Sequence, residues 1–166
     1  VIVFTDGACE EGEDGTSIGG VIYIPGGGCE CFGARMTPGS IERWKTRDGQ
    51  TQVIGQAEVF PVLVARLTWA THLVNRRALY FIDNESARLA LIKGYSPVLP
   101  TLDILMEVLG WDFDKQSFPW YSRVPTASNI GDGPSRMSLD GFAEGARPQV
   151  VAPVFPVGYE ASVVLV

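Results

Sequence analysis

Four short segments spread along this 166-residue chain each carry one acidic residue beside an apolar run. The acids are Asp6, Glu58, Asp83 and Asp132. Clustered carboxylates repel one another and raise each other's pKa unless a cation neutralises them. Chains that bring four carboxylates together are typically those that hold divalent metal, most often to cleave or transfer phosphoryl groups. The four acids therefore indicate metal-assisted phosphoryl chemistry.

The apolar pattern predicts an α/β chain that must position these acids. Short β-branched or alternating runs bounded by turn residues indicate strands, and apolar residues three and four positions apart indicate helices. The predicted strands span 1–5, 17–24, 29–36, 78–82 and 118–124, and the predicted helices span 56–73, 85–93 and 99–109, with a final short helix or turn opening at Asn129. The first three strands are expected to form an antiparallel meander.

This topology predicts that the acids meet at one edge of the sheet. A helical crossover favours parallel pairing of the first and fourth strands, which places Asp6 and Asp83 side by side at strand ends, where α/β sheets bind ligands. Glu58 is expected in the first turn of the long helix, and Asp132 in the final helix. Two Mg²⁺ ions, or Mn²⁺, would suit these oxygen ligands: one would activate water and the other would stabilise the leaving oxygen of a phosphodiester.

Each acid also has an ordinary structural interpretation. An Asp that ends a strand is common in turns and at helix N-caps. Glu58 in a first helical turn would interact favourably with the helix dipole. Asn129 as N-cap and Asp132 near the third helical position would form a capping box. The convergence of all four, rather than any one acid, predicts the site.

Composition favours one intracellular globular domain. The hydrophobic content is 46% and the charged content 19%. No apolar run reaches about 18 residues, so we expect no membrane span, and no signal peptide is visible. Three cysteines beside the single His72 favour free thiols in a reducing setting over disulfides or zinc; they are Cys9, Cys29 and Cys31. The net charge of −6 argues against nucleic-acid binding, but the acidic loop at 10–14 contributes much of it.

The segments that carry the acids resemble the ribonuclease H domain fused to reverse transcriptases in retroelements and reverse-transcribing viruses. Phe4-Thr5-Asp6-Gly7-Ala8 is similar to the first hairpin of that family, Gln56-Ala57-Glu58 to the start of its long helix, and Phe81-Ile82-Asp83-Asn84 to its fourth strand and turn. The most specific similarity is that of Asn129-Ile130-Gly131-Asp132-Gly133-Pro134-Ser135-Arg136 to its final motif. The resemblance covers residues 1–139 in the family's order.

The resemblance implies a ribonuclease H-like fold, with a five-stranded mixed sheet of three antiparallel strands followed by parallel strands, flanked by helices. It implies that the four acids hold the metal and that the chain cleaves the RNA strand of RNA–DNA hybrids, with a reverse transcriptase domain in the same polyprotein as its partner. We expect the catalytic domain to span residues 1–145, with a Pro/Val-rich tail or linker at 146–166. Expected substrate contacts are Gly7, Cys9, Asn84, Ser86 and Arg136.

The sequence departs from the family pattern in two ways. Many cellular members place a histidine in the loop after the fifth strand, whereas residues 125–130 contain none; the basic, Trp-rich segment between helices is also missing. A non-catalytic structural or hybrid-binding domain is therefore one alternative, and a resolvase on the same fold is another. Ala8 stands where a proofreading exonuclease would carry a second acid, which disfavours that class.

Overall fold

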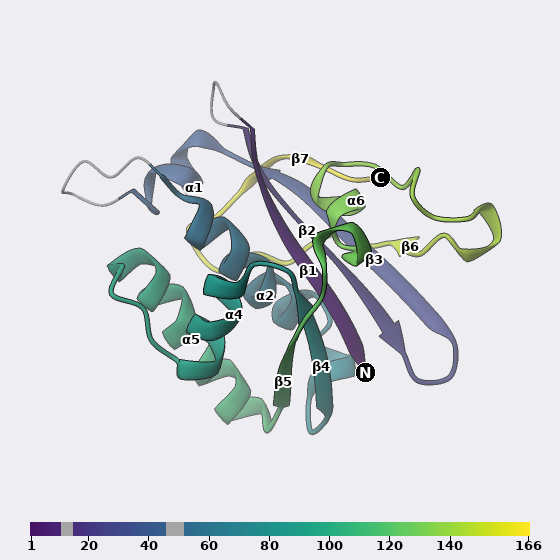
Figure 1. The fold of residues 1–166 in the computed structure, drawn as a ribbon, viewed down its shortest axis with the longest axis horizontal. Helices are drawn as coiled ribbons and strands as arrows, with labels where there is room; N and C mark the ends of the chain where they lie inside the picture. The colour runs from purple at the N-terminus through teal and green to yellow at the C-terminus, as the bar shows by residue number, and fades with distance from the viewer. Residues whose placement is uncertain (11–14, 46–51) are drawn as a thin grey trace.

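The computed structural model describes residues 1–10, 15–45 and 52–166. These residues form a seven-stranded sheet in the order β5-β4-β1-β2-β3-β6, with β7 also paired to β3 (Figure 1). Its antiparallel part comprises β1 (Ile2–Glu10), β2 (Gly15–Ile24) and β3 (Gly28–Met36). β4 (Arg77–Ile82) lies parallel to β1, and β5 (Phe118–Arg123) lies parallel to β4. The predicted mixed sheet is confirmed, and the tail adds two short strands to it.

Helices cover the sheet unequally on its two faces. One face of the sheet carries α2 (Ile54–Thr68) and α4 (Glu85–Lys93), and α5 (Leu99–Lys115) packs against α2; α4 and α5 lie to the left of β4 and β5 in Figure 1. The opposite face carries the short α6 (Asp132–Ser135). The remaining helical segments are α1 (Pro38–Glu42), α3 (Ala70–Leu73) and the 3₁₀ turns Thr126–Ser128 and Glu144–Ala146. None of the described helices is long and apolar enough to cross a bilayer.

Local signals account for the bounds of α4. The Asn84 side chain accepts a hydrogen bond from the Ala87 backbone N–H at 3.0 Å, as an N-cap does. The helix ends at Gly94, whose φ of +62° lies in the left-handed region that glycine tolerates. The predicted helix at 85–93 is confirmed.

Other predicted bounds are wrong. β1 continues past residue 5 to Glu10, so Asp6 lies inside the strand rather than at its end. The predicted helix at 56–73 begins earlier, at Ile54, and breaks into α2 and α3 at Trp69. Pro61 lies within α2. Residues 37–45, for which the sequence predicts neither helix nor strand, contain α1. Residues 46–51 and most of the acidic loop, 11–14, lie outside the described part of the chain.

The C-terminal tail packs against the edge strand of the sheet. β6 (Gln149–Val150) pairs parallel with the early part of β3, and β7 (Ala161–Val164) pairs antiparallel with its later part. Between them, Tyr159 packs on Phe60 of α2, with ring centroids 4.6 Å apart, and Arg43 lies over the Tyr159 ring at 5.0 Å. The tail thus covers an edge that would otherwise present unpaired backbone groups. The domain boundary at residue 145 stays a prediction.

A buried ion pair joins the helices to the parallel strands. Arg66 of α2 is fully buried, and its Nε and Nη2 donate to the two carboxylate oxygens of Asp112 on α5 at 2.7 and 2.8 Å. Nη2 also donates to the hydroxyl of Tyr121 on β5 at 2.7 Å, and the guanidinium lies 4.6 Å from the ring centroid of Tyr80 on β4. The bidentate geometry and the third hydrogen bond compensate for removing both charges from water.

We expect Arg66→Met to destabilise the protein by about 3–5 kcal/mol, because it leaves the Asp112 carboxylate buried without its cation. Urea denaturation followed by circular dichroism measures this change. Arg88→Met is the matched control: Arg88 pairs with the exposed Glu85, so its loss should change stability little. An equal loss of stability in the two variants would show that the buried Arg66–Asp112 pair stabilises the protein no more than the exposed Arg88–Glu85 pair does.

Candidate active site

Three of the four predicted acids converge in the structure. Ligand atoms of Asp6, Glu58 and Asp83 all lie within 4.8 Å of one another. Asp6 comes from the middle of β1, Glu58 from the fifth residue of α2, and Asp83 from the end of β4. The parallel pairing of β1 with β4, in register at Phe4 and Phe81, places the two aspartates together as predicted. The expected first-turn position of Glu58 is wrong, because α2 begins four residues before it.

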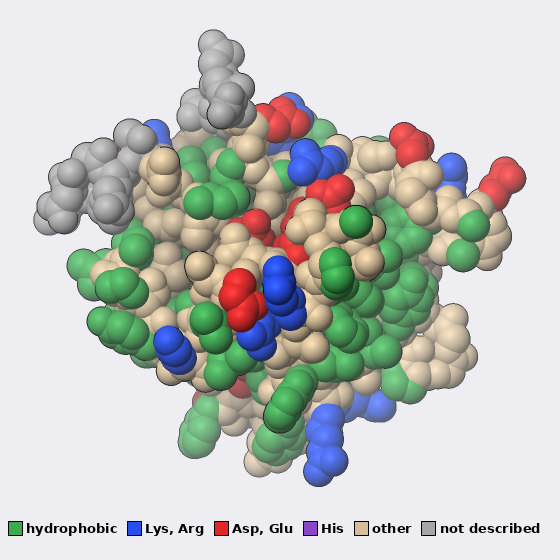
Figure 2. Space-filling view, viewed as in Figure 1, with side chains coloured by type: hydrophobic (Ala, Val, Ile, Leu, Met, Phe, Trp, Pro, Cys, Tyr) green, Lys and Arg blue, Asp and Glu red, His purple; other side chains and the backbone are tan. Residues whose placement is uncertain are grey.

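Asp132 lies on the same cavity without joining this triad. The cavity has a volume of about 340 Å³ and is lined by all four acids together with Gly7, Asn84, Thr126 and Arg136. The Asp132 carboxylate accepts a hydrogen bond from Arg136 Nε at 2.8 Å, and both side chains are partly exposed. Figure 2 shows red acidic side chains gathered near the centre of this face. The Asp132 carboxylate thus lines the cavity but forms an ion pair with Arg136.

The carboxylate of Asp6 is fixed by the C-terminal motif. Ser135 Oγ donates to Asp6 Oδ2 at 2.5 Å, and Asn129 Nδ2 lies 3.4 Å from Asp6 Oδ1 and 3.2 Å from the carbonyl oxygen of Thr5. Asn129 Oδ1 accepts from the Gly131 N–H, so the predicted capping box with Asp132 does not form; Gly131 is the N-cap of α6. Asn129 therefore tethers the motif to β1.

Two paired glycines allow α6 to approach the sheet this closely. Gly19 and Gly33 face each other across β2 and β3. A Cβ on Gly19 would lie 2.2 Å from the Ser135 backbone nitrogen, and one on Gly33 would lie 2.3 Å from the Pro134 carbonyl oxygen. Real atoms do not approach so closely, so larger residues would push Ser135 away from Asp6. No local pattern in the sequence indicates this function of the glycines or the contact from Ser135 to Asp6.

Glu58 is held from the other face of the sheet. The backbone of Gly7 lies against α2, where a Cβ on Gly7 would be 2.1 Å from the Ala57 carbonyl oxygen. Gly7 thus allows β1 to approach the helix that carries Glu58. The Glu58 carboxylate accepts hydrogen bonds from the Gly7 backbone N–H and from the Asn84 side chain. Gly7 and Asn84 therefore orient an acid as well as line the cavity.

Burial and mutual repulsion raise the pKa values of two acids. Burial is the main cause for Asp6, whose pKa rises to about 6; the Ser135 hydrogen bond opposes this rise and the charge of Asp83 adds to it. Burial also dominates for Glu58, and with the charges of Asp6 and Asp83 it raises the Glu58 pKa to about 8. Near neutral pH the triad therefore retains a proton that a bound cation would displace.

The triad fits a hard divalent cation. Oε2 of Glu58 and Oδ1 of Asp83 are buried, and neither has a hydrogen-bond partner among the described residues. Buried carboxylate oxygens rarely lack partners, because losing their hydration is costly. Oxygen ligands at this density are those that Mg²⁺ and Mn²⁺ prefer. Asp6, Glu58 and Asp83 would hold the ion, and Asp132 is placed to contribute to a second one.

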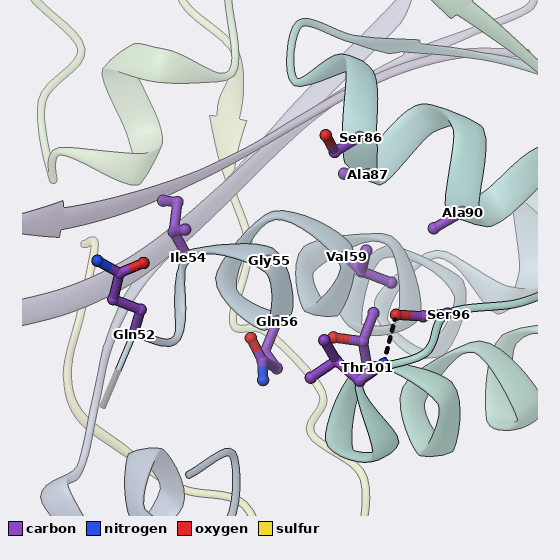
Figure 3. A pocket seen from close by; sticks show the side chains of 11 residues that line it. Gln52, Ile54, Gly55, Gln56, Val59, Ser86, Ala87, Ala90, Ser96 and Thr101 are labelled. Carbon is purple, nitrogen blue, oxygen red and sulfur yellow. Dashed lines mark hydrogen bonds between the residues drawn. The ribbon is translucent and has the colours of Figure 1, made fainter. Parts of the chain in front are cut away.

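Two predicted substrate contacts lie away from the acidic cavity. Cys9, farther along β1, is exposed and lies 3.8 Å from the Thr16 hydroxyl. Ser86 lines a neighbouring cavity of about 530 Å³ between α2, α4 and the start of α5, across from Gly55 and Gln56 (Figure 3). His72 lies on α3, beyond the far end of α2 from Glu58.

Three solved structures that are similar to this chain are ribonucleases H. Ribonuclease H1 of the halophilic archaeon Halobacterium salinarum NRC-1 matches with a TM-score of 0.59 at 14% identity, over 85% of this chain and 98% of that one. LC11 ribonuclease H1, in complex with an RNA/DNA hybrid, matches with a TM-score of 0.58 at 15% identity, over 84% and 96%. The N-terminal ribonuclease H domain of a Mycobacterium tuberculosis protein matches with a TM-score of 0.52 at 12% identity, over 84% and 92%.

These likenesses establish the fold. The chain adopts the ribonuclease H fold, as the sequence resemblance implied. No protein-family model and no curated protein sequence matches the chain. At identities of 12–16% these structural matches show the fold alone.

We expect Asp83→Asn to raise the melting temperature in metal-free buffer, because it removes one of three mutually repelling carboxylates. Thermal unfolding with EDTA measures this effect. The same variant should lose most of the stabilisation that Mn²⁺ gives the wild type, because binding to the folded state is linked to stability. Asp140→Asn, at an acid outside the cavity lining, is the control. A lower melting temperature in EDTA would mean that Asp83 is structural.

We also expect metal-free stability to fall as pH rises from about 5 to about 8. Glu58 titrates near 4.5 ordinarily and near 8 in the folded protein, and Asp6 near 3.8 and near 6. The folded state therefore binds more protons than the unfolded state within these windows, so raising the pH favours unfolding. Urea denaturation at several pH values in EDTA tests this. Glu58→Gln should flatten the dependence above about pH 6; a wild-type stability that rises with pH would contradict the electrostatic account.

Proposed function

We propose that the chain is a metal-dependent endonuclease that hydrolyses the RNA strand of RNA–DNA hybrids. The observation that carries this proposal is the triad of Asp6, Glu58 and Asp83 on a ribonuclease H fold, with two buried carboxylate oxygens unpartnered in the described structure. One structural neighbour is a ribonuclease H1 in complex with an RNA/DNA hybrid, which supports the substrate class.

The proposed reaction is attack of water on phosphorus with loss of the 3′ oxygen of the preceding nucleotide. Bound Mg²⁺, or Mn²⁺, would supply a more acidic water and stabilise the charge on the leaving oxygen. Asp6 is held in position by Ser135 and Asn129, so its carboxylate is preorganised. Glu58 and Asp83 each keep one oxygen free for a ligand. The products would be a 5′ phosphate and a 3′ hydroxyl.

The substrate must approach a cavity whose charged lining residues are acidic apart from one basic residue. Arg136 lines the cavity beside Asp132, and we propose that it contacts a backbone phosphate. Asn84 shares this cavity, whereas Ser86 would contact the hybrid from the neighbouring one. Cys9, exposed on β1, is the proposed contact to the minor groove, where a 2′-hydroxyl distinguishes RNA from DNA.

We further propose that the domain belongs to a reverse transcriptase polyprotein and acts inside the cell. The support for the polyprotein is the resemblance of residues 129–136 to the final motif of the retroelement family. The support for a reducing compartment is that Cys9, Cys29 and Cys31 are all free.

The test is cleavage of a hybrid labelled on its RNA strand, in Mg²⁺ or Mn²⁺. We expect metal-dependent cutting of the RNA and a loss of at least about 100-fold in Asp6→Asn and Asp83→Asn, because each removes a ligand charge. Asp103→Asn, at an exposed acid on α5, should retain activity.

Three other outcomes distinguish the alternatives. A folded protein that binds the hybrid without cutting it would be a non-catalytic binding domain. Cutting that appears only when a reverse transcriptase domain is joined to the chain would support dependence on that partner. Cleavage of four-way DNA junctions in preference to hybrids would favour a resolvase.

A further inference from the structure

Helix α5 carries two apolar surfaces, and the sheet and α2 account for only one of them. Its core side presents the buried Ile104, Leu105 and Val108, with Asp112 paired to Arg66. A second set of apolar residues recurs at intervals of three and four along its outer side. We call this set the α5 seam: Leu99, Leu102, Met106, Leu109 and Phe113.

The α5 seam is open to solvent in the described structure. Leu99 is 70% exposed, Met106 49%, Leu109 40% and Phe113 85%, and Leu102 is half-buried. Figure 2 shows hydrophobic side chains protruding at the left of the molecule, where Figure 1 places α5. Isolated exposed apolar residues are ordinary on protein surfaces, whereas a continuous row of this length marks an interaction site.

The spacing of the α5 seam is that of a helix–helix contact. Its residues alternate steps of three and four, which is the a/d pattern by which one helix packs its side chains into another. From Leu99 to Phe113 the seam extends about 21 Å, at 1.5 Å per residue. This length matches a partner helix of about four turns.

Negative charge along one border of the α5 seam indicates which kind of partner could bind there. The exposed acids Asp103, Glu107 and Asp114 follow the seam on its solvent side, and we call them the acidic row. On the other border, Leu109 packs over Gly94, at the end of α4, beside the exposed Tyr95. The basic residues of these two helices other than Arg88 are Lys93 and Lys115, each the last residue of its helix. The outer surface of α5 is therefore apolar on one side and acidic on the other.

This asymmetry disfavours two common occupants. A second copy of α5 packed antiparallel would bring one acidic row against the other, which costs free energy. An anionic membrane surface would likewise repel the acidic row. A helix whose apolar stripe is bordered by lysine or arginine matches both the seam and the charge.

We propose that the α5 seam docks an amphipathic α-helix of a partner protein, with a leucine-type stripe bordered by basic residues. The partner side chains at heptad spacing pack between Leu102, Met106 and Leu109, and its cations face the acidic row. The seam lies on a different element from the triad, so the partner can bind while the acidic cavity stays open to substrate.

Two labelled probe peptides test this proposal by fluorescence anisotropy. Both are 21-residue helices with leucine at heptad spacing, and they differ only in lysine or glutamate at the bordering positions. We expect the lysine peptide to bind at least about tenfold more tightly than the glutamate peptide. The double variant Met106→Asn/Phe113→Asn should weaken binding by at least about tenfold, because it removes apolar contacts at the centre and end of the seam.

Control variants distinguish specific docking at the α5 seam from nonspecific binding of the peptides. Val157→Asn changes a tail residue that is 99% exposed and should leave binding unchanged. Asp103→Lys/Glu107→Lys should reverse the preference, so that the glutamate peptide binds better. Thermal unfolding of each variant should match the wild type, because the substituted side chains are exposed.

Four results would overturn the proposal. They are failure of the folded protein to bind either peptide, equal affinity for the two, binding that survives the loss of Met106 and Phe113, and preference unchanged by charge reversal. A wild-type dimer in sedimentation that the Met106→Asn/Phe113→Asn variant abolishes would assign the seam to a second copy. Binding to phosphatidylserine vesicles that depends on the same two residues would assign it to a lipid surface.

Discussion

Electrostatic repulsion among Asp6, Glu58 and Asp83 is the constraint that the surrounding structure must withstand. Three carboxylates with ligand atoms within 4.8 Å would separate if their elements were free to move. The sheet prevents this on one side by pairing β1 with β4 in parallel, and α2 is fixed to the parallel strands by the buried Arg66. The geometry of the site thus depends on strand pairing beside the carboxylates and on a buried ion pair outside the triad.

The three acids are restrained to different degrees, which matters for what they can do. Both oxygens of Asp6 have contacts within the chain, whereas Glu58 and Asp83 each leave one buried oxygen unpartnered. The first arrangement fixes a ligand in place, and the second provides open coordination positions. A site built this way costs stability when empty and regains it when a cation enters.

Local signals and simple topology account for what the sequence predicted. Asn84 and Gly94 bound α4 through chemistry that depends on neighbouring residues alone, and the helical crossover sufficed to pair Asp6 with Asp83. The errors arose where distant contacts decide. Nothing local shows that β1 continues through Gly7, that the tail forms strands on β3, or that Arg66 is buried against Asp112. Asn129 likewise resembles a helix cap but serves a strand more than a hundred residues earlier.

The hydrogen bond between Ser135 and Asp6 also determines when the site can form during protein synthesis. Asp6 leaves the ribosome well before Ser135, which fixes its carboxylate and lies 129 positions later. Domains fold as units once the chain needed for their long-range contacts has emerged. The acidic centre therefore cannot be completed on a partly translated chain. In a nascent chain the carboxylates of the triad therefore stay apart until residues 129–136 have been synthesised.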